Sequence, residues 1–353
     1  MDGADAVLIQ MQGKQWQRAV AHSFLPYSDG LRQELLALQD IGENELHRSN
    51  ILAQTLSRLY AQTVQQLLTE QNLSAKGIAA IGCHGQTIRH APEHGYSIQL
   101  VNLSLLAELT GIFTVGDFRS RDLACNGQGA PLVPAFHEAL FRDVNETRAV
   151  LNIGGISNIS ILPPDGPSFG FDTGPGNMLM DAWMQHIWQQ PYDKNGEKAV
   201  QGEILPDLLA SLLDHPYFSR PYPKSTGREL FSLSWLQGRL KGDGKPEDVI
   251  RTLVFYTAQT IFDATKQAAP AIHHLYICGG GIRNPVLMHD LETLFSPDTQ
   301  LHSTAKLHLD PQWVEAAAFA WLAACWCNQV PSNPHHATGA HSHRILGSGH
   351  YGN

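Results

Sequence analysis

The chain has 353 residues, and a single hydrophobic core rarely grows to that length, so we expect two domains. Hydrophobic residues make up 43% of the chain and charged residues 16%, which is typical of a folded globular protein and excludes a disordered one. The formal net charge of −9, with no obvious basic cluster, argues against a nucleic-acid partner.

The first residues contain no basic leader, and no apolar run approaches the roughly 20 residues that cross a bilayer. The five cysteines are scattered and form no C-x-x-C pair, which argues against a disulfide framework and against a zinc knuckle. We therefore expect a cytoplasmic protein with reduced thiols and no membrane partner.

In the first part of the chain, alternating residues predict strands, and apolar residues spaced three and four apart predict helices. The predicted elements, in chain order, are a strand over 4–11, a long helix around 52–68, a strand over 78–85, a short helix over 103–109 and a strand over 111–117. A glycine-rich loop over 117–131 then leads into a helix over 131–143. We place the domain boundary near Asp143, so that residues 1–143 form the first domain.

The second domain is predicted over 144–330 and begins with a new sheet. Its predicted elements are strands over 148–155, 156–162 and 168–174, helices over 177–189, 204–213 and 246–268, a strand over 273–281, a helix from Asn284 and a last helix over 311–327. Asp310 is the expected N-cap of the last helix and Pro311 its first residue. Residues 331–353 are predicted to be irregular, and their five histidines are more typical of solvated side chains than of a metal site. The alternation of strands and helices predicts an α/β fold.

Two short matches to known motifs lack the structural context that their chemistry needs. Residues 347–352 fit the dinucleotide fingerprint, but that motif requires a strand before it and a helix after it. Residues 166–170 fit the nucleophile elbow of serine hydrolases, but ILPPDG just before them predicts a hairpin turn. We therefore expect neither a dinucleotide site nor a serine hydrolase.

Three glycine-rich turns end predicted strands of the second domain, over 152–155, 172–177 and 279–284. Glycine lets a ligand approach backbone N–H groups closely, and a turn that opens a helix adds the positive end of the helix dipole. One such turn alone is more often just a tight turn, but three in one domain favour a nucleotide site. Asp172 is either a turn former or a carboxylate beside bound phosphate, able to hold a metal or to act as a general base.

Two polar stretches of the first domain, 82–90 and 117–122, also follow predicted strands. They gather imidazole, amide, hydroxyl, guanidinium and carboxylate groups, which suit a sugar hydroxyl or a substrate carboxylate, because arginine grips a carboxylate with two hydrogen bonds. Each residue alone is more typical of a polar surface. Together they predict a substrate site.

These motifs resemble the anhydro-N-acetylmuramic acid kinases of bacterial cell-wall recycling. The resemblance rests on HGQTIRH, GDFRSRDLACNGQGAPLVPAFHEALFR, NIGGISN, GFDTGPGNMLMDAW, CGGGIRN, LDPQWVEAAAFAWLA and TGAHSHRILGSGHYGN, so it spans nearly the whole chain. It implies an actin-like, ribonuclease H-like sugar-kinase fold with a mixed sheet in each of two α/β domains and ATP in the cleft between them. It also implies a homodimer.

The reaction implied by the resemblance consumes ATP and water. It opens the ring of 1,6-anhydro-N-acetylmuramic acid and phosphorylates the 6-oxygen, giving N-acetylmuramic acid 6-phosphate and ADP. No metal-binding motif is present, so Mg²⁺ is expected to be carried by ATP. Asp172 is implied as the base that acts on water, and Glu315 as a second catalytic residue that orients the sugar or the water.

The resemblance also implies two sets of binding residues. The expected substrate-binding residues are His84, Gln86, Thr87, Arg119 and Asp122. The expected ATP-binding residues are Asp2, Gly3, Asp5, Asn152, Gly154, Gly155, Thr173, Gly174, Gly176, Asn177, Gly279, Gly280, Gly281 and Asn284.

The chain departs from the family pattern at two places. Asn126 stands where the family loop usually has glycine, and asparagine tolerates the left-handed conformation expected there. The chain also begins at the methionine of the family's G-T-S-M-D-G loop, so the first strand and part of the phosphate loop are expected to be missing and the strand over 4–11 to have unpaired backbone groups. An alternative function follows, a catalytically disabled sugar-binding or nucleotide-binding remnant of the kinase.

Overall fold

The computed structural model describes residues 3–13, 15–222, 224–227, 230–240, 242, 244–269 and 271–352. The chain divides into two compact units. Unit 1 contains Met1–Leu140 and Trp313–Asn353, and unit 2 contains Phe141–Gln312. The first division lies close to the boundary expected near Asp143. The second division differs from the expected second domain over 144–330, because residues 313–330 belong to unit 1.

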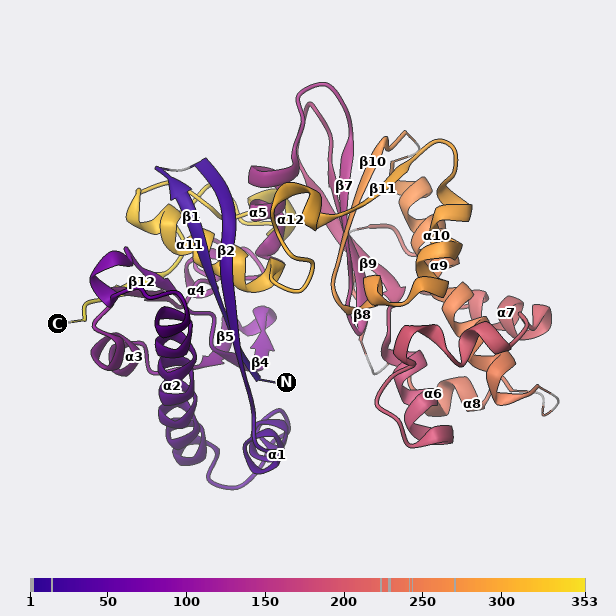
Figure 1. Ribbon diagram of the computed structural model, residues 1–353, viewed down its shortest axis with the longest axis horizontal. Coiled ribbons are helices and arrows are strands. Elements are labelled where there is room, and N and C mark those ends of the chain that lie inside the picture. Colours follow the sequence, from indigo (N-terminus) through magenta and orange to yellow (C-terminus); the bar gives the residue numbers. More distant parts are fainter. Residues whose placement is uncertain are drawn as a thin grey trace. The chain divides into compact units, whose positions relative to one another are not determined.

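Unit 1 begins with a long antiparallel hairpin of β1 (Gly3–Gln12) and β2 (Gln15–Pro26), which is visible in Figure 1. α1 (Asp29–Ala37) follows, with Ser28 as its N-cap, and then α2 (Glu45–Glu70). The apolar stripe of α2 includes Leu52, Leu56 and Leu67, all buried, and the helix packs along β1. The apolar periodicity over 52–68 therefore marks the face that covers the hairpin.

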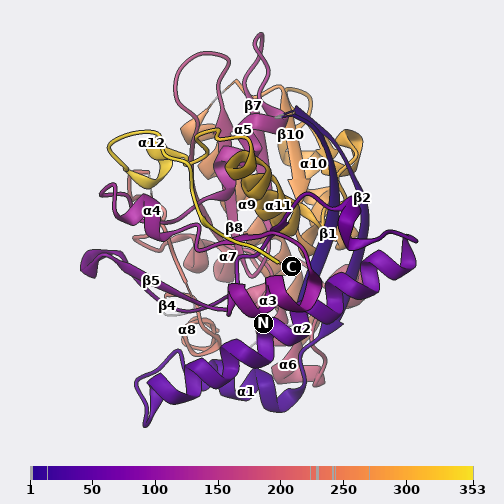
Figure 2. The ribbon, with the colours of Figure 1, turned by 90° about the vertical axis from the view of Figure 1, so that its left-hand side faces the viewer.

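A second, mixed sheet of unit 1 has the order β12–β6–β3, formed by β12 (Ser348–His350), β6 (Thr114–Gly116) and β3 (Ile81–Gly82). β3 runs parallel to β6, and β12 runs antiparallel to it. A separate hairpin pairs β4 (Gln86–Ala91) with β5 (Tyr96–Leu100), and Figure 2 shows it extending as two thin strands. The other helical elements of unit 1 are α3 (Leu103–Thr110), α4 (Ser120–Leu123), α5 (Val133–Phe141), α11 (Val314–Cys327), α12 (His335–Thr338), and the short turns η1 (Ala75–Gly77) and η2 (Pro92–His94).

Unit 2 is built on a mixed five-stranded sheet with the order β11–β10–β7–β8–β9. Its strands are β7 (Arg148–Ile153), β8 (Ile156–Leu162), β9 (Phe169–Pro175), β10 (His274–Cys278) and β11 (Gln300–Ser303). Its helices are α6 (Met178–Trp188), α7 (Pro206–Leu213), α8 (Leu233–Gln237), α9 (Pro246–Ala268) and α10 (Pro285–Phe295), with short turns η3 (Lys194–Gly196), η4 (Ala199–Gln201), η5 (Gly280–Arg283) and η6 (Thr304–Leu307). β7, β10 and β11 are parallel, whereas β8 is antiparallel to both β7 and β9.

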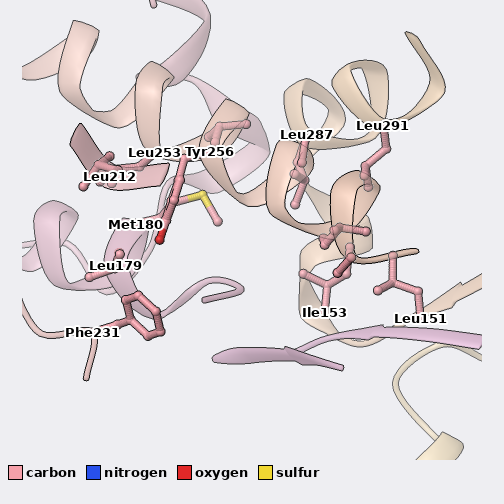
Figure 3. Packing of buried hydrophobic residues seen from close by; sticks show 14 of the residues in the cluster. Leu151, Ile153, Leu179, Met180, Leu212, Phe231, Leu253, Tyr256, Leu287 and Leu291 are labelled. Carbon is pink, nitrogen blue, oxygen red and sulfur yellow. The ribbon is translucent and has the colours of Figure 1, made fainter. Parts of the chain in front are cut away.

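The core of unit 2 lies between this sheet and its helices. Leu151 and Ile153 of β7 face Leu287 and Leu291 of α10, as Figure 3 shows, and all four side chains are fully buried. α9 contributes a second set of buried residues, Leu253 and Tyr256 among them. Burying each such aliphatic side chain stabilises the unit by about 1.5–3 kcal/mol, so the sheet edge that carries the glycine-rich turns has a rigid support.

The α/β class and the mixed sheet in each unit are confirmed. α9 has the predicted bounds, and the predicted helix from Asn284 is α10, with Asn284 as its N-cap. The hairpin turn predicted at ILPPDG joins β8 to β9. These elements carry strong local signals, namely apolar periodicity and caps.

The prediction for the last helix was wrong at its start. α11 begins at Val314, because Asp310 accepts a hydrogen bond from the Gln312 N–H (2.8 Å) in a turn that precedes the helix. The irregular segment predicted over 331–353 instead contains α12 and β12. β12 is a three-residue strand whose glycine-rich sequence carries no strand pattern, and pairing with β6 fixes it.

β2 and the β4–β5 hairpin were not predicted. The β1–β2 ladder is interrupted by register shifts at Leu8/Ile9 and Gln10/Met11, which break a clean alternation of buried and exposed residues. β1 nevertheless pairs with β2 along its whole length. Within the described residues, β1 has no strand on its other edge.

Candidate active site

Three glycine-rich loops of unit 2 lie at one edge of its sheet. β7 and β10 are parallel, and β9 runs in the same direction as β7 because both are antiparallel to β8. Their carboxyl ends therefore meet at the same edge, where ligands bind in open α/β sheets. The loops that begin at Gly154, Gly176 and Gly279 all follow these strand ends.

Two of these loops are tied together by backbone hydrogen bonds. The N–H groups of Gly176 and Met178 donate to the carbonyl of Gly155 (2.9 and 3.1 Å), and the N–H of Asn177 donates to Gly154 (2.8 Å). The first N–H groups of the turn into α6 therefore already donate to backbone carbonyls of the neighbouring loop. The exposed backbone at this edge belongs to Gly155 and Gly280, where an added Cβ would meet little but Met178 or Asn177.

Gly279 requires glycine for two separate reasons. Its φ is +83°, in the region that other residues rarely adopt, and an added Cβ would clash with Asn152 Oδ1 and with the Ile153 carbonyl. The β10 loop therefore packs closely against the end of β7, and this close packing aligns the two loops.

The expected ATP-binding residues have different environments. Gly155 and Gly280 are exposed, and Asn152, Gly154, Asn177 and Gly279 are half-buried. The buried members are Thr173, Gly174, Gly176 and Gly281. The Thr173 hydroxyl donates to the Ser157 carbonyl (3.2 Å), and the Asn284 side chain caps α10 by accepting from the N–H groups of Val286 and Leu287.

The remaining expected ATP-binding residues belong to unit 1. Gly3 and Asp5 lie in β1, and Asp5 Oδ1 is 2.8 Å from Nε2 of His22 on the neighbouring strand. Asp2 lies outside the described residues.

Asp172 lies in β9, shortly before Gly174 and Gly176 of the glycine-rich edge of unit 2. Its Oδ2 accepts a hydrogen bond from the Thr226 N–H (3.0 Å), and its backbone carbonyl accepts one from the Tyr217 hydroxyl (2.6 Å). Its own N–H donates to the Lys224 carbonyl (2.9 Å). Burial raises the pKa of Asp172 to about 6, and the Thr226 N–H opposes this rise. Such a carboxylate is ionised at neutral pH yet basic enough to accept a proton.

Sequence reasoning missed Tyr217, Lys224 and Thr226. They lie in the segment between α7 and α8, which carries no periodic pattern. The polar YPKSTG stretch that contains Lys224 and Thr226 was the only available signal.

Unit 1 brings Arg119 and His84 together at the carboxyl ends of the parallel strands β3 and β6. Arg119 Nε and a terminal guanidinium nitrogen lie 3.0 and 2.9 Å from His84 Nε2, and another guanidinium nitrogen donates to the Gly129 carbonyl (2.7 Å). Burial, reinforced by the Arg119 charge, lowers the pKa of His84 to about 3. The imidazole is therefore neutral, and because Nε2 accepts, Nδ1 carries its proton.

Asp122 is fully buried and its carboxylate is engaged by the chain itself. Oδ2 accepts from the Gly129 N–H (2.8 Å), while Oδ1 accepts from the Thr338 hydroxyl (2.9 Å) and from Asn333 Nδ2 (3.2 Å). Arg119 and Asp122 thus hold the two sides of the same residue, Gly129. The carboxylate fastens this loop to residues 333–338 and presents no free oxygen at the surface.

The same loop settles the expectation for Asn126. Its φ is +60°, the left-handed conformation expected at this position, so the prediction is confirmed. Its side-chain amide lies 3.2 Å from Nδ1 of His341.

Glu315 lies in the first turn of α11, one turn before Phe319, whose ring stacks on His84 at 4.4 Å between centroids. Solvent reaches Glu315, while the surrounding protein desolvates its carboxyl enough to raise its pKa, and the Arg119 guanidinium opposes this rise. Arg119, His84 and Glu315 therefore form one polar group in unit 1.

Gln86 and Thr87 begin β4 just after His84 and are half-buried. The Thr87 hydroxyl accepts from Gln99 Nε2 (3.3 Å) across the β4–β5 hairpin, and Gln86 Nε2 donates to the Thr87 carbonyl (3.3 Å).

Within the described part of the chain, no three His, Cys, Asp or Glu side chains are arranged to hold a metal ion. The same residues contain no helix with the length and apolar character that a membrane span requires.

Among solved structures, the chain is similar to the activator of the 2-hydroxyisocaproyl-CoA dehydratase from Clostridium difficile with bound ADPNP. The sequences are 12% identical and the TM-score is 0.47, over 93% of this chain and 96% of that chain. This likeness is too weak to inform the site.

Sequence relatives are much closer. A family model for anhydro-N-acetylmuramic acid kinase matches residues 1–352. A protein named anhydro-N-acetylmuramic acid kinase from Neisseria meningitidis serogroup C (strain 053442) is 69% identical over 351 residues, covering 99% of this chain and 96% of that protein. One of the same name from Nitrosomonas europaea is 50% identical with the same coverage. The chain therefore belongs to the anhydro-N-acetylmuramic acid kinase family.

Proposed function

We propose that the chain uses ATP and water to convert 1,6-anhydro-N-acetylmuramic acid into N-acetylmuramic acid 6-phosphate and ADP. Family membership over nearly the full length supports the reaction. The observation that carries the assignment of residues is Asp172, a desolvated carboxylate at a sheet edge lined by glycine-rich loops. The setting that we propose is the bacterial cytoplasm and the assembly a homodimer, both on the basis of the family alone.

Asp172 acts as the general base in this proposal. It accepts a proton from water as the water oxygen forms a bond to the anomeric carbon. The bond between that carbon and the 6-oxygen breaks, and the 6-oxygen forms a bond to the γ-phosphorus as the bond from that phosphorus to ADP breaks. One water and one ATP are consumed for each sugar, and Asp172 then releases the proton to solvent, so atoms and charge balance. A base of this pKa is suited to the task because proton transfer is most efficient when the pKa lies near the working pH.

ATP is assigned to the glycine-rich edge of unit 2. Gly155 and Gly280 fit a phosphate chain because both are exposed and a Cβ added at either would make only ordinary contacts, with Met178 at 3.9 Å and Asn177 at 3.6 Å. We propose that Mg²⁺ enters with ATP, held by phosphate oxygens and water, where it would neutralise charge on the triphosphate.

The sugar is assigned to the polar group of unit 1. Within the described residues, three of the five Arg119 N–H groups donate to His84 and Gly129, which leaves two to bind a carboxylate such as that of the muramic acid. His84 buttresses the guanidinium, and Asp122 fixes the loop through Gly129. We propose that Glu315 orients the sugar or the attacking water, and that Gln86 and Thr87 contribute hydroxyl and amide contacts.

The Asp172→Asn variant should lose turnover and keep its fold. Loss of one positioned base lowers kcat by roughly 10²- to 10⁴-fold. Because burial raises the pKa of Asp172 from 3.8 to about 6, ionisation of this group lowers the folding stability progressively between these two pH values, and the full cost is present at neutral pH. The melting temperature of Asp172→Asn at neutral pH should therefore equal or exceed that of the wild type. Coupled ADP-release kinetics and thermal melts measure both.

Asp263→Asn is the matched control for this variant, since Asp263 is a carboxyl of the same unit whose pKa is also raised by burial but which lies on α9. It should keep wild-type turnover. If Asp172→Asn kept more than about a tenth of wild-type kcat, the general-base assignment would be wrong.

The pH profile should report the same group. Since the base works only when deprotonated, kcat/KM for the sugar should fall as the pH drops through about 6. MgATP is kept saturating at every pH, because a phosphate group also takes up a proton in this range. A rate that stays flat well below this pH, with the protein still folded, contradicts the assignment.

Arg119→Ala and Glu315→Gln should fail in different ways. Arg119→Ala should mainly raise KM for the sugar if its contacts are equal in the ground and transition states, whereas Glu315→Gln should mainly lower kcat if Glu315 acts on the attacking water. Arg121→Ala, at an exposed neighbour of Arg119, serves as the control and should change neither constant. The reverse pattern would mean that the binding and chemical roles have been exchanged.

A further inference from the structure

A segment between α7 and α8 is fastened to Asp172 at three points. This segment, residues 217–222 and 224–226 as described, is called the Asp172 strap. Tyr217 near its start donates to the Asp172 carbonyl (2.6 Å), the Lys224 carbonyl accepts from the Asp172 N–H (2.9 Å), and the Thr226 N–H holds Oδ2 (3.0 Å). The strap thus fixes both the backbone and one carboxylate oxygen of Asp172.

Lys224 closes the strap on itself. Its side chain is buried, with the residue 9% exposed, and Nζ donates to the carbonyls of Phe218 (3.0 Å) and Tyr217 (3.4 Å). The ammonium also lies 4.9 Å from the centroid of the Tyr217 ring. Burial lowers the pKa of Lys224. A buried ammonium is costly unless its donors are satisfied, so carbonyls and a ring face must compensate here.

The position of the Lys224 ammonium argues against a direct role of this group in the reaction. Its partners are two backbone carbonyls and an aromatic face, all within the strap. The pKa of Asp172 responds to burial and to the Thr226 N–H. The side chain therefore acts on the base only through the geometry of the strap.

We propose that Lys224 is a positioning residue for the general base Asp172. Its ammonium joins the start of the strap, at Tyr217 and Phe218, to the end of the strap, where Thr226 holds Oδ2. With Oδ2 held, Oδ1 is directed to accept the proton of the attacking water. This inference rests on the proposed function and adds to it a residue whose ammonium binds within the strap.

The test compares steady-state kinetics of Lys224→Met, Tyr217→Phe and the wild type, with thermal melts of each. A misplaced reacting group costs up to about 10²-fold, so Lys224→Met should lower kcat by roughly 10- to 100-fold with both KM values within about twofold. Lys198→Met is the matched control, because Lys198 also sits over an aromatic ring of unit 2, that of Trp188 (5.3 Å), away from the strap. It should keep the wild-type kcat.

A folded Lys224→Met protein with wild-type kcat, or one whose loss lies only in KM, overturns the inference and leaves the proposed function standing. If Lys224→Met does not fold, Tyr217→Phe decides, since it removes only the hydroxyl that holds the Asp172 carbonyl. A lowered kcat in that variant supports the strap, and an unchanged kcat overturns it. A wild-type protein that does not turn over the sugar overturns the proposed function and this inference together.

Discussion

The hydrogen bond from the Thr226 N–H to Asp172 reconciles two opposing requirements of the site. A general base must be desolvated enough to be basic, and it must also be ionised at neutral pH. Burial raises the pKa of Asp172 to about 6, and the Thr226 N–H limits that rise. The rest of unit 2 supports this balance. β9 is fixed by pairing with β8, the strap supplies the donor, and the packed core under β7 and β10 keeps the glycine-rich loops in register with the base.

In unit 1, the surrounding residues hold the Arg119 side chain in place without neutralising its charge. Among the residues that the structure describes, no carboxylate contacts Arg119 directly. Arg119 donates to a neutral imidazole, His84, and to a carbonyl, Gly129, so its positive charge stays available to an anionic substrate group. The two fixing points are themselves held from behind, His84 by the ring of Phe319 and Gly129 by the carboxylate of Asp122. Asp122 therefore contributes to the site through position rather than through contact.

The features that could be predicted from the sequence are those that depend on a few neighbouring residues. The apolar periodicity of α2 and α9, the glycine-rich turns after β7, β9 and β10, and the left-handed Asn126 are all legible over a few residues. The burial of Asp122 is not, because its partners Asn333 and Thr338 lie more than 200 positions away in the chain. The same holds for β12, which pairs with β6. The contacts of the strap could not be predicted for another reason. Lys224 donates to backbone carbonyls, and such bonds leave no pattern of complementary side chains in the sequence.

The origin of the oxygen added to the sugar tests the account most directly. The reaction is run in ¹⁸O-labelled water and the products are examined by mass spectrometry, with preformed product incubated in the same water to measure spontaneous exchange. If Asp172 activates water toward the anomeric carbon, the label appears on the anomeric oxygen of N-acetylmuramic acid 6-phosphate beyond the exchange control, and the phosphate carries none. Label in inorganic phosphate, with the sugar unchanged, would show plain ATP hydrolysis and contradict the account.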